Sequence, residues 1–142
     1  MYSRPVTAPT EAPREGAKRV YLAGPPDAEE YRRRAEPLVQ AIGWVPVDPM
    51  RRDFRGQTEG KEVEIVEGDL AEIESCDAVL AAFTAPDEGT AMEAWYAHGL
   101  GKLVVAYTGG TPPHPWTAYV ADVICDDLER AVLALSAQPL AD

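Results

Sequence analysis

GDLAEIESCDAVLAAF, residues 68–83, contains the end of a helical pattern followed by an unbroken apolar run. Apolar residues at helical spacing predict a helix over 61–75 with one face toward the core. The positions on that face are Val63, Val66, Leu70 and Ile73. The run AVLAAF (78–83) has no polar side chain, which is typical of a strand that is buried on both faces. A buried strand after a helix favours a parallel sheet that is covered by helices.

The same alternation extends along the chain in both directions from this segment. The expected strands are RVYLAG (19–24), WVPVDP (44–49), AVLAAF (78–83), KLVVAY (102–107) and a short strand or helix–strand junction in VADVIC (120–125). The expected helices cover residues 27–42, 61–75, 90–100 and 126–136, the last with Asp126 or Asp127 as its N-cap. Pro46 favours an edge position for its strand. This order predicts an α/β fold: a flavodoxin-like, doubly wound, five-stranded parallel sheet in three layers.

Composition limits the classes of protein to which the chain can belong. The length of 142 residues fits one domain, expected over 18–137 after a flexible tail at 1–17. The net charge of −11 comes without a basic stripe, which disfavours a nucleic-acid partner. No apolar run is long enough for a membrane, and the N-terminus resembles no secretory signal. Cys76 and Cys125 are expected to be buried free thiols, which predicts a cytoplasmic protein.

The position of a functional site follows from the predicted sheet, because such sheets bind ligands beyond the carboxyl ends of their strands. The unusual residues of this chain cluster there. They are Gly24-Pro25, Asp48-Pro49-Met50, and the segments 84–90 and 108–115. No Cys/His cluster has the spacing of a zinc site, so we expect a site without a metal.

Glu93 is the first candidate for chemistry at this rim. In PDEGTAMEAWYAHGLGK (86–102), Gly89 and Thr90 can form the turn and cap that start a helix. Glu93 would then lie in the first turn, where free amide groups and the helix dipole keep a carboxylate ionised. The alternative is structural, because Thr90 and Glu93 also fit a capping box. The apolar neighbours of Glu93 favour a functional role.

Asp69 is the second candidate. It is adjacent to Leu70 on the expected helix and can therefore border the core, although a solvated helix acid is the structural alternative. Two carboxyl groups at one rim suit the cleavage of a glycosidic bond, in which one attacks the anomeric carbon and the other protonates the leaving group. In enzymes that retain the anomeric configuration, the two groups lie about 5–5.5 Å apart.

Four segments together resemble the nucleoside 2-deoxyribosyltransferase family, over nearly all of residues 19–135. They are VYLAGP (20–25), VPVDP (45–49), GDLAEIESCDAVL (68–80) and PDEGTAMEAWYAHGLGK (86–102). The resemblance implies an enzyme that transfers 2-deoxyribose between nucleobases through a covalent ester. Its partners would be a deoxynucleoside and a free nucleobase. Such a reaction needs neither a metal nor an organic cofactor.

The resemblance also implies roles for individual residues. Glu93 corresponds to the nucleophile, Asp69 to the acid that protonates the departing base, and Tyr21 to the tyrosine that orients the nucleophile. Asp87 corresponds to a residue that binds sugar hydroxyls. His114 stands where the family often has an Asn from a neighbouring subunit, so a homo-oligomer with sites completed across subunits is implied.

Three further residues belong to the expected substrate-binding set. Gly24 lies at the exit of the first strand, and Gly89 lies in the nucleophile segment. Met50 stands where some relatives have a polar residue that reads the base. Together with Pro26-Asp27, which replaces an aromatic residue of the family, Met50 leaves the base preference open.

Asp87 bears on the substrate class. Related nucleoside-monophosphate glycosidases usually have Ser at this position, as part of a phosphate pocket. A carboxylate there would repel a phosphate dianion, which favours free nucleosides. The structural alternative is that Asp87 caps a turn after Pro86.

Two other functions stay open at this stage. The first is a hydrolase of the same architecture that acts on nucleosides or nucleoside monophosphates, which differs only in whether water or a base reaches the ester. The second is a non-catalytic nucleoside-sensing domain. The presence of Tyr21, Asp69, Asp87 and Glu93 in one chain favours an enzyme.

Overall fold

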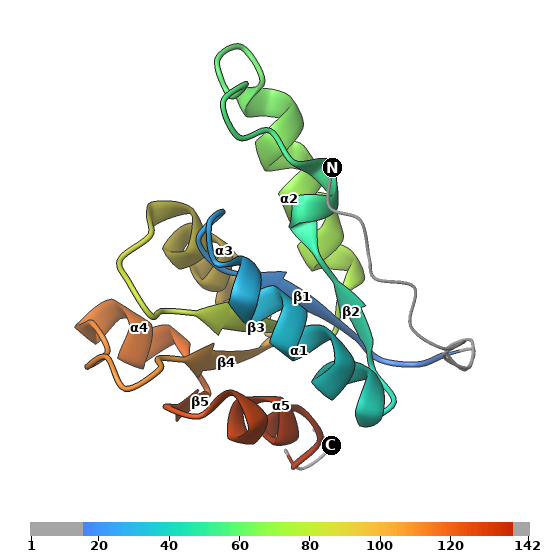
Figure 1. Ribbon diagram of the computed structural model, residues 1–142, viewed down its shortest axis with the longest axis vertical. Coiled ribbons are helices and arrows are strands. Elements are labelled where there is room, and N and C mark those ends of the chain that lie inside the picture. Colours follow the sequence, from blue (N-terminus) through green and yellow to red (C-terminus); the bar gives the residue numbers. More distant parts are fainter. Residues whose placement is uncertain (1–15, 138–142) are drawn as a thin grey trace.

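The computed structural model, which describes residues 16–137, contains one five-stranded sheet with helices on both faces (Figure 1). The strands are β1 (Arg19–Ala23), β2 (Val45–Val47), β3 (Ala78–Ala82), β4 (Leu103–Tyr107) and β5 (Val123–Cys125), in the order β2-β1-β3-β4-β5. Every neighbouring pair is parallel. The flavodoxin-like α/β fold is thus confirmed, with Pro46 in the edge strand β2. Of the expected tail, residues 1–15 lie outside the described part of the chain.

Two sets of helices complete the three layers. The helices are α1 (Glu29–Ala41), α2 (Glu62–Ser75), α3 (Glu88–Gly99), α4 (Pro115–Val120) and α5 (Leu128–Ala137), with a short 3-10 helix, η1 (Pro49–Arg52). Helices α1 and α5 pack on one face of the sheet, and α2, α3 and α4 pack on the other. None of the helices within residues 16–137 is both long enough and apolar enough to cross a membrane.

Strand β1 shows how the sheet distributes its side chains between these layers. Successive residues of a strand point to opposite faces. Val20 and Leu22 therefore join the core below α1 and α5, whereas Tyr21 and Ala23 join the core below α2 and α3. All four are fully buried. The alternation thus directs Tyr21 toward the helices that carry Asp69 and Glu93.

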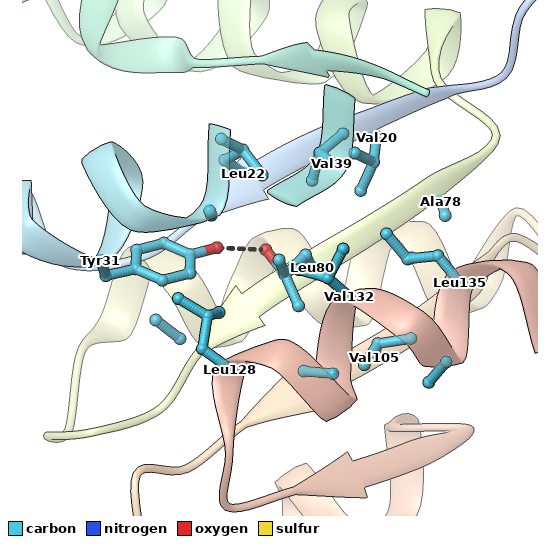
Figure 2. Packing of buried hydrophobic residues seen from close by; sticks show 14 residues of the cluster. Val20, Leu22, Tyr31, Val39, Ala78, Leu80, Val105, Leu128, Val132 and Leu135 are labelled. Atoms are coloured by element: carbon cyan, nitrogen blue, oxygen red, sulfur yellow. Dashed lines mark hydrogen bonds between the residues drawn. The ribbon is translucent and has the colours of Figure 1, made fainter. Parts of the chain in front are cut away.

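The core on the other face includes a tyrosine from α1 that is tied to the sheet. Tyr31 is buried, and its hydroxyl donates a hydrogen bond of 2.9 Å to the carbonyl oxygen of Leu80 in β3 (Figure 2). Val39 and Leu128 pack into the same cluster. A buried hydroxyl needs such a partner, because an unpaired one would lose the hydrogen bonds it makes to water.

The expected core face of α2 is wrong for the first half of the helix. Val63 and Val66 are 69% and 51% exposed, whereas Ile73 is fully buried. Figure 1 shows why: the first half of α2 and the loop before it extend beyond the sheet. Apolar periodicity indicates a helix, but it does not show how far the neighbouring layer reaches.

Other elements also differ from the expected ones. Residues 49–52, expected as strand end and loop, form η1, because Asp48 accepts a hydrogen bond of 2.8 Å from the Met50 amide and caps it. The short helix α4 was not expected. It takes up the residues before β5, which is reduced to Val123–Cys125. Of the two proposed caps of α5, Asp127 accepts the Glu129 amide at 2.7 Å.

The bond between α1 and the sheet generates a stability prediction. We expect Tyr31→Phe to lower the free energy of unfolding by about 1 kcal/mol, because it removes the buried donor to Leu80. Tyr96→Phe is the matched control, since the Tyr96 hydroxyl bonds to Glu74 at an exposed position and water can replace that bond. Urea denaturation followed by circular dichroism measures both. Equal effects of the two substitutions would contradict this prediction.

Candidate active site

A tyrosine from the sheet and a glutamate from α3 form the centre of the site. Tyr21 is fully buried in β1, and its hydroxyl donates a hydrogen bond to Oε2 of Glu93. Burial raises the pKa of Tyr21 far above its ordinary value, and the adjacent Glu93 and Asp69 raise it further. Tyr21 is therefore a neutral hydrogen-bond donor over the whole physiological pH range.

The start of α3 differs from the sequence expectation. Its N-cap is Asp87, not Thr90: Oδ2 of Asp87 accepts hydrogen bonds from the Thr90 amide at 3.0 Å and the Thr90 hydroxyl at 2.6 Å. The helix begins at Glu88, so Glu93 lies in the second turn. Its carboxyl group is beyond the free amide groups, and the helix dipole acts mainly in the first turn. The proposed stabilisation of ionised Glu93 by the helix terminus is thus wrong.

Burial determines the protonation of Glu93 instead. It raises the pKa of Glu93 to about 8, with the hydrogen bond from Tyr21 acting in the opposite direction. The negative charges of Asp69 and Asp87 add to the increase, and the cation of Arg32 reduces it. Burial thus favours the protonated form of Glu93 in the free protein.

Asp69 approaches the same tyrosine from α2. Its side chain is 25% exposed, and its Oδ1 lies 3.0 Å from Nη2 of Arg52. Burial raises the pKa of Asp69, whereas the hydrogen bond and charge of Arg52 lower it, and the nearby hydroxyl of Tyr21 lowers it as well. The structure thus brings Tyr21, Asp69 and Glu93 together from three elements, β1, α2 and α3.

Arg52 and Glu72 are two members of this cluster that the sequence analysis missed. Arg52 ends η1, and its Nε donates to Oε1 of Glu72 at 2.8 Å. Glu72 lies one turn after Asp69 in α2, so a single guanidinium contacts both carboxylates. The sequence gives no direct sign of this pairing, because η1 and α2 are separated by a polar loop.

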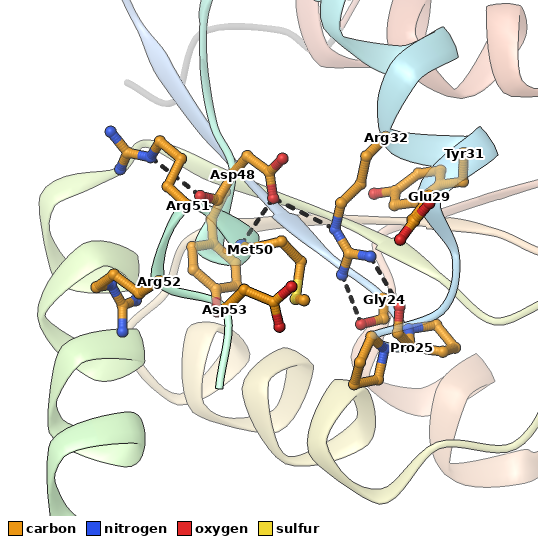
Figure 3. Close-up of polar contacts among 12 residues, drawn as sticks. Gly24, Pro25, Glu29, Tyr31, Arg32, Asp48, Met50, Arg51, Arg52 and Asp53 are labelled. Atoms are coloured by element: carbon orange, nitrogen blue, oxygen red, sulfur yellow. Dashed lines mark hydrogen bonds and ion pairs between the residues drawn. The ribbon is translucent and has the colours of Figure 1, made fainter. Parts of the chain in front are cut away.

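Arg32 is a third residue that the sequence analysis missed, and it holds two strand ends in place (Figure 3). It is 2% exposed and donates to the carbonyl oxygens of Pro25 at 2.8 Å and Gly24 at 2.7 Å. Its Nε lies 3.4 Å from Oδ1 of Asp48, which follows β2. The carboxyl ends of β1 and β2 are thereby joined through one buried cation. An arginine in a helix with three consecutive arginines is ordinarily expected to be solvated.

The expected substrate-binding residues Gly24, Met50 and Gly89 lie around this framework. A Cβ at Gly24 would be 3.1 Å from the Tyr31 ring, so the glycine permits a close packing of β1 against α1. Met50 is half-buried and extends from η1 toward the turn at Gly24 (Figure 3). Gly89 is exposed in the first turn of α3. Their roles toward a substrate remain predictions.

A cavity of about 400 Å³ lies beside the start of α3. Its lining includes Asp87 and His114, with Trp95 and Trp116 as aromatic walls. His114 is exposed and caps α4, its Nδ1 accepting the Trp116 amide at 3.2 Å. The cavity is not lined by the group of Tyr21, Asp69 and Glu93. Asp87 connects the two places, because it lines the cavity and its charge acts on Glu93.

These contacts define what the site can do. A buried carboxyl group that is oriented by a neutral tyrosine, next to a second carboxyl group, provides a nucleophile and an acid at one place. Among residues 16–137, no three His, Cys, Asp or Glu side chains are grouped so that they could hold a metal ion.

Several solved structures are similar in fold. The 2-deoxyribosyltransferase of Bacillus psychrosaccharolyticus is 19% identical with a TM-score of 0.65, over 86% of this chain and 93% of that one. The CMP N-glycosidase of Clostridium botulinum is 18% identical with a TM-score of 0.60, over 84% and 99%. A CheY-like receiver domain of Methanospirillum hungatei is 19% identical with a TM-score of 0.52, over 84% and 90%. At this identity the similarity concerns the fold.

Sequence comparison identifies the family. No curated protein matches the chain at a significant level. The family model described as nucleoside 2-deoxyribosyltransferase matches residues 20–132, which is most of the chain and spans Tyr21, Asp69 and Glu93. The chain therefore belongs to the nucleoside 2-deoxyribosyltransferase family.

Proposed function

We propose that the protein transfers 2-deoxyribose between nucleobases by a retaining double displacement, with Glu93 as the nucleophile. The observation that carries the proposal is the hydrogen bond from Tyr21 to Glu93, with the charge of Asp69 close enough to act on both side chains. Membership in a family of deoxyribosyltransferases gives the class of reaction.

In the first displacement, a carboxylate oxygen of Glu93 attacks C1′ of a deoxynucleoside while Asp69 donates a proton to the departing base. The C1′–N bond breaks, its electron pair stays on the base, and a deoxyribosyl ester of Glu93 forms. In the second displacement, a nitrogen of a new base attacks C1′ and Asp69 takes its proton. The C1′–O bond of the ester breaks, which restores the carboxylate of Glu93, and Asp69 again holds its proton. Two inversions give net retention.

The site without substrate meets one requirement of this scheme, which is the presence of a proton. The placement of that proton on Asp69 depends on substrate binding. The scheme needs one proton, on Asp69, and an ionised Glu93. Burial raises the pKa of both groups, and two interacting carboxyl groups share protons rather than titrate separately. Burial of both groups thus favours retention of the proton that the scheme requires. Substrate binding must then favour the form in which Asp69 holds it.

The substrate is proposed to be a free deoxynucleoside and not a nucleotide. Asp87 carries its charge at the start of α3, and Glu88 follows it in the lining of the same cavity. Two acidic side chains there would raise the free energy of a bound phosphate dianion. The alternative is an N-glycosidase that acts on nucleosides or monophosphates, since a CMP N-glycosidase shares the fold. A non-catalytic sensor is the third candidate.

A second copy of the chain is proposed to complete the site through the surface formed by α3 and α4. Its exposed apolar side chains are Met92, Trp95, Trp116 and Tyr119, which are 70%, 49%, 66% and 71% exposed. The Trp95 ring lies 5.6 Å from that of Trp116 and 6.5 Å from that of Tyr119, so they form one continuous surface. A cluster of this kind is typical of an interaction site. His114 lies beside it and is the residue proposed to reach the neighbouring site.

The cellular setting follows from the same proposal. An exchange of bases on deoxyribose serves nucleoside salvage. Cys76 and Cys125 are both free, Cys76 buried and Cys125 half-buried, which suits the reducing conditions of the cytoplasm.

Activity assays test the reaction class. Wild-type protein with deoxyinosine and adenine should form deoxyadenosine, and with deoxyinosine alone should release little hypoxanthine. Glu93→Ala should lower the rate by several orders of magnitude, because no ester can form. Glu67→Ala removes an exposed acid of α2 and should leave the rate unchanged. Hypoxanthine release without exchange, from this nucleoside or its monophosphate, would favour the hydrolase, and no reaction with any donor would favour the sensor.

The buried carboxyl group generates a stability prediction. The pKa of Glu93 rises from an ordinary 4.5 to about 8, so between these pH values the unfolded chain loses a proton that the folded protein keeps. Each pH unit of this window then lowers the free energy of unfolding by up to about 1.4 kcal/mol. Glu93→Gln does not titrate, so it should be the more stable protein at pH 8, by about 2 kcal/mol or more, and similar to wild type at pH 4.5. Urea denaturation at both pH values measures this. A difference that does not depend on pH would contradict the assignment.

Mixing of inactive variants tests the shared site. His114→Ala should have low activity, as should Glu93→Ala. If His114 acts on the neighbouring subunit, co-expression of these two variants should restore activity, because some mixed sites then contain an intact Glu93 and an intact His114. Glu93→Ala with Asp69→Ala is the matched control and should stay inactive, because both residues belong to one subunit. Full activity of His114→Ala, or no restoration, would rule out the shared site.

A further inference from the structure

Gly68 lies in the interior of α2, where glycine is among the least favourable residues for a helix. The structure gives a reason for its presence. A Cβ on this residue would lie 2.4 Å from Nη1 and 3.0 Å from Cζ of Arg52. Any larger side chain would therefore displace the guanidinium from the surface of α2.

The guanidinium that occupies this space binds the two acidic residues that follow Gly68. Its Nη2 donates to Oδ1 of Asp69 at 3.0 Å, and its Nε donates to Oε1 of Glu72 at 2.8 Å. The donors of an arginine form a rigid planar fork, so two such bonds fix the orientation of both partners. Oδ1 of Asp69 is used by this contact, whereas Oδ2 is left for another partner.

The charges around Asp69 make this contact more than a surface ion pair. The groups that face Asp69 are Arg52 from η1, Glu72 from α2, Tyr21 from β1 and, through its charge, Glu93 from α3. Arg52 is the cation that contacts Asp69, whereas Arg51 lies 3.6 Å from Oε1 of Glu72 and Arg32 acts on Glu93 through its charge. Oε2 of Glu72 is also buried and accepts no hydrogen bond from the described residues. Three carboxyl groups that lie so close together repel one another without a cation.

We propose that Arg52 is a positioning residue for the acid of the reaction: it holds one oxygen of Asp69, directs the other toward the departing nucleobase, and needs the space that Gly68 provides. The inference rests on the proposed function, in which Asp69 exchanges a proton with the base. Arg52 is not itself proposed to contact the substrate.

A second consequence concerns the pH at which Asp69 loses its proton. Burial raises the pKa of Asp69, and Arg52 opposes this effect. Without Arg52, burial acts with less opposition and the pKa rises further. The protonated form, which the first displacement requires, then persists to higher pH. The alkaline limb of the pH profile should therefore move upward when Arg52 is replaced by a neutral residue.

Four variants test the proposal. Arg52→Gln should lower kcat at least about tenfold with little change in KM, since a small misplacement of a catalytic group is costly, and should move the alkaline limb upward. Arg52→Lys keeps the positive charge but not the planar set of donors. Its alkaline limb should therefore stay at the wild-type pH, and its kcat should lie between those of wild type and Arg52→Gln. Gly68→Ala should reproduce the loss of kcat although Arg52 is present. Arg55→Gln, which removes an exposed arginine that pairs with Asp53 and Glu29, should behave as wild type.

Two readouts separate a positioning role from a purely structural one. Thermal unfolding shows whether a variant is folded, and carbon-13 NMR of the Asp69 carboxyl follows its titration without any substrate. A higher titration midpoint in Arg52→Gln supports the inference. An unchanged midpoint and an unchanged pH profile in a folded variant would overturn it. If the wild type has neither transferase nor hydrolase activity, the proposed function fails, while the NMR titration still decides whether Arg52 controls Asp69.

Discussion

The hydrogen bond between Tyr21 and Glu93 connects the centre of the sheet to helix α3, and most of the site depends on it. Tyr21 lies in β1, which pairs with β2 and β3, so the sheet fixes the backbone from which its side chain extends. Glu93 lies beside a cluster of buried side chains, so its carboxyl group is shielded from water. A carboxyl group in such a place is costly as an anion unless donors compensate. Tyr21 provides one of these donors.

The acidic side chains around this bond repel one another, which is a second constraint. Arg52 and Arg32 reduce this repulsion in different ways. Arg52 contacts Asp69 and Glu72 directly, whereas Arg32 acts on Glu93 from a position behind the turn at Gly24. Neither arginine removes the excess of negative charge. Functional sites commonly hold groups that are costly to bury, and this group of acids is of that kind. A bound sugar would displace water from the acidic side chains and so change the free energy of their charged forms.

The sequence predicted the sheet well because each strand is a separate apolar run, and β3 is buried over its whole length. It predicted α2 but not its exposed first half, because periodicity shows one face of a helix and not the extent of the layer below. Helix α4 was missed because it is short and follows prolines. The contacts of Arg32 and Arg52 were missed because their partners belong to other elements. The one available sign was Gly68, a glycine inside a helical pattern.

The cap of α3 shows how the fold and the proposed choice of substrate depend on each other. The free amide groups at the start of a helix attract anions, and a phosphate is a common ligand there. In this protein, Asp87 already occupies that position and accepts the Thr90 amide and hydroxyl. The N-cap residue thus occupies donors and adds a negative charge where a nucleotide would need free donors and no negative charge. The protonation of Glu93, one turn further along α3, depends on burial and on the hydrogen bond from Tyr21. An uncharged nucleoside suits such a site, because it needs hydrogen bonds from the rim of the sheet and brings no charge to the buried acids.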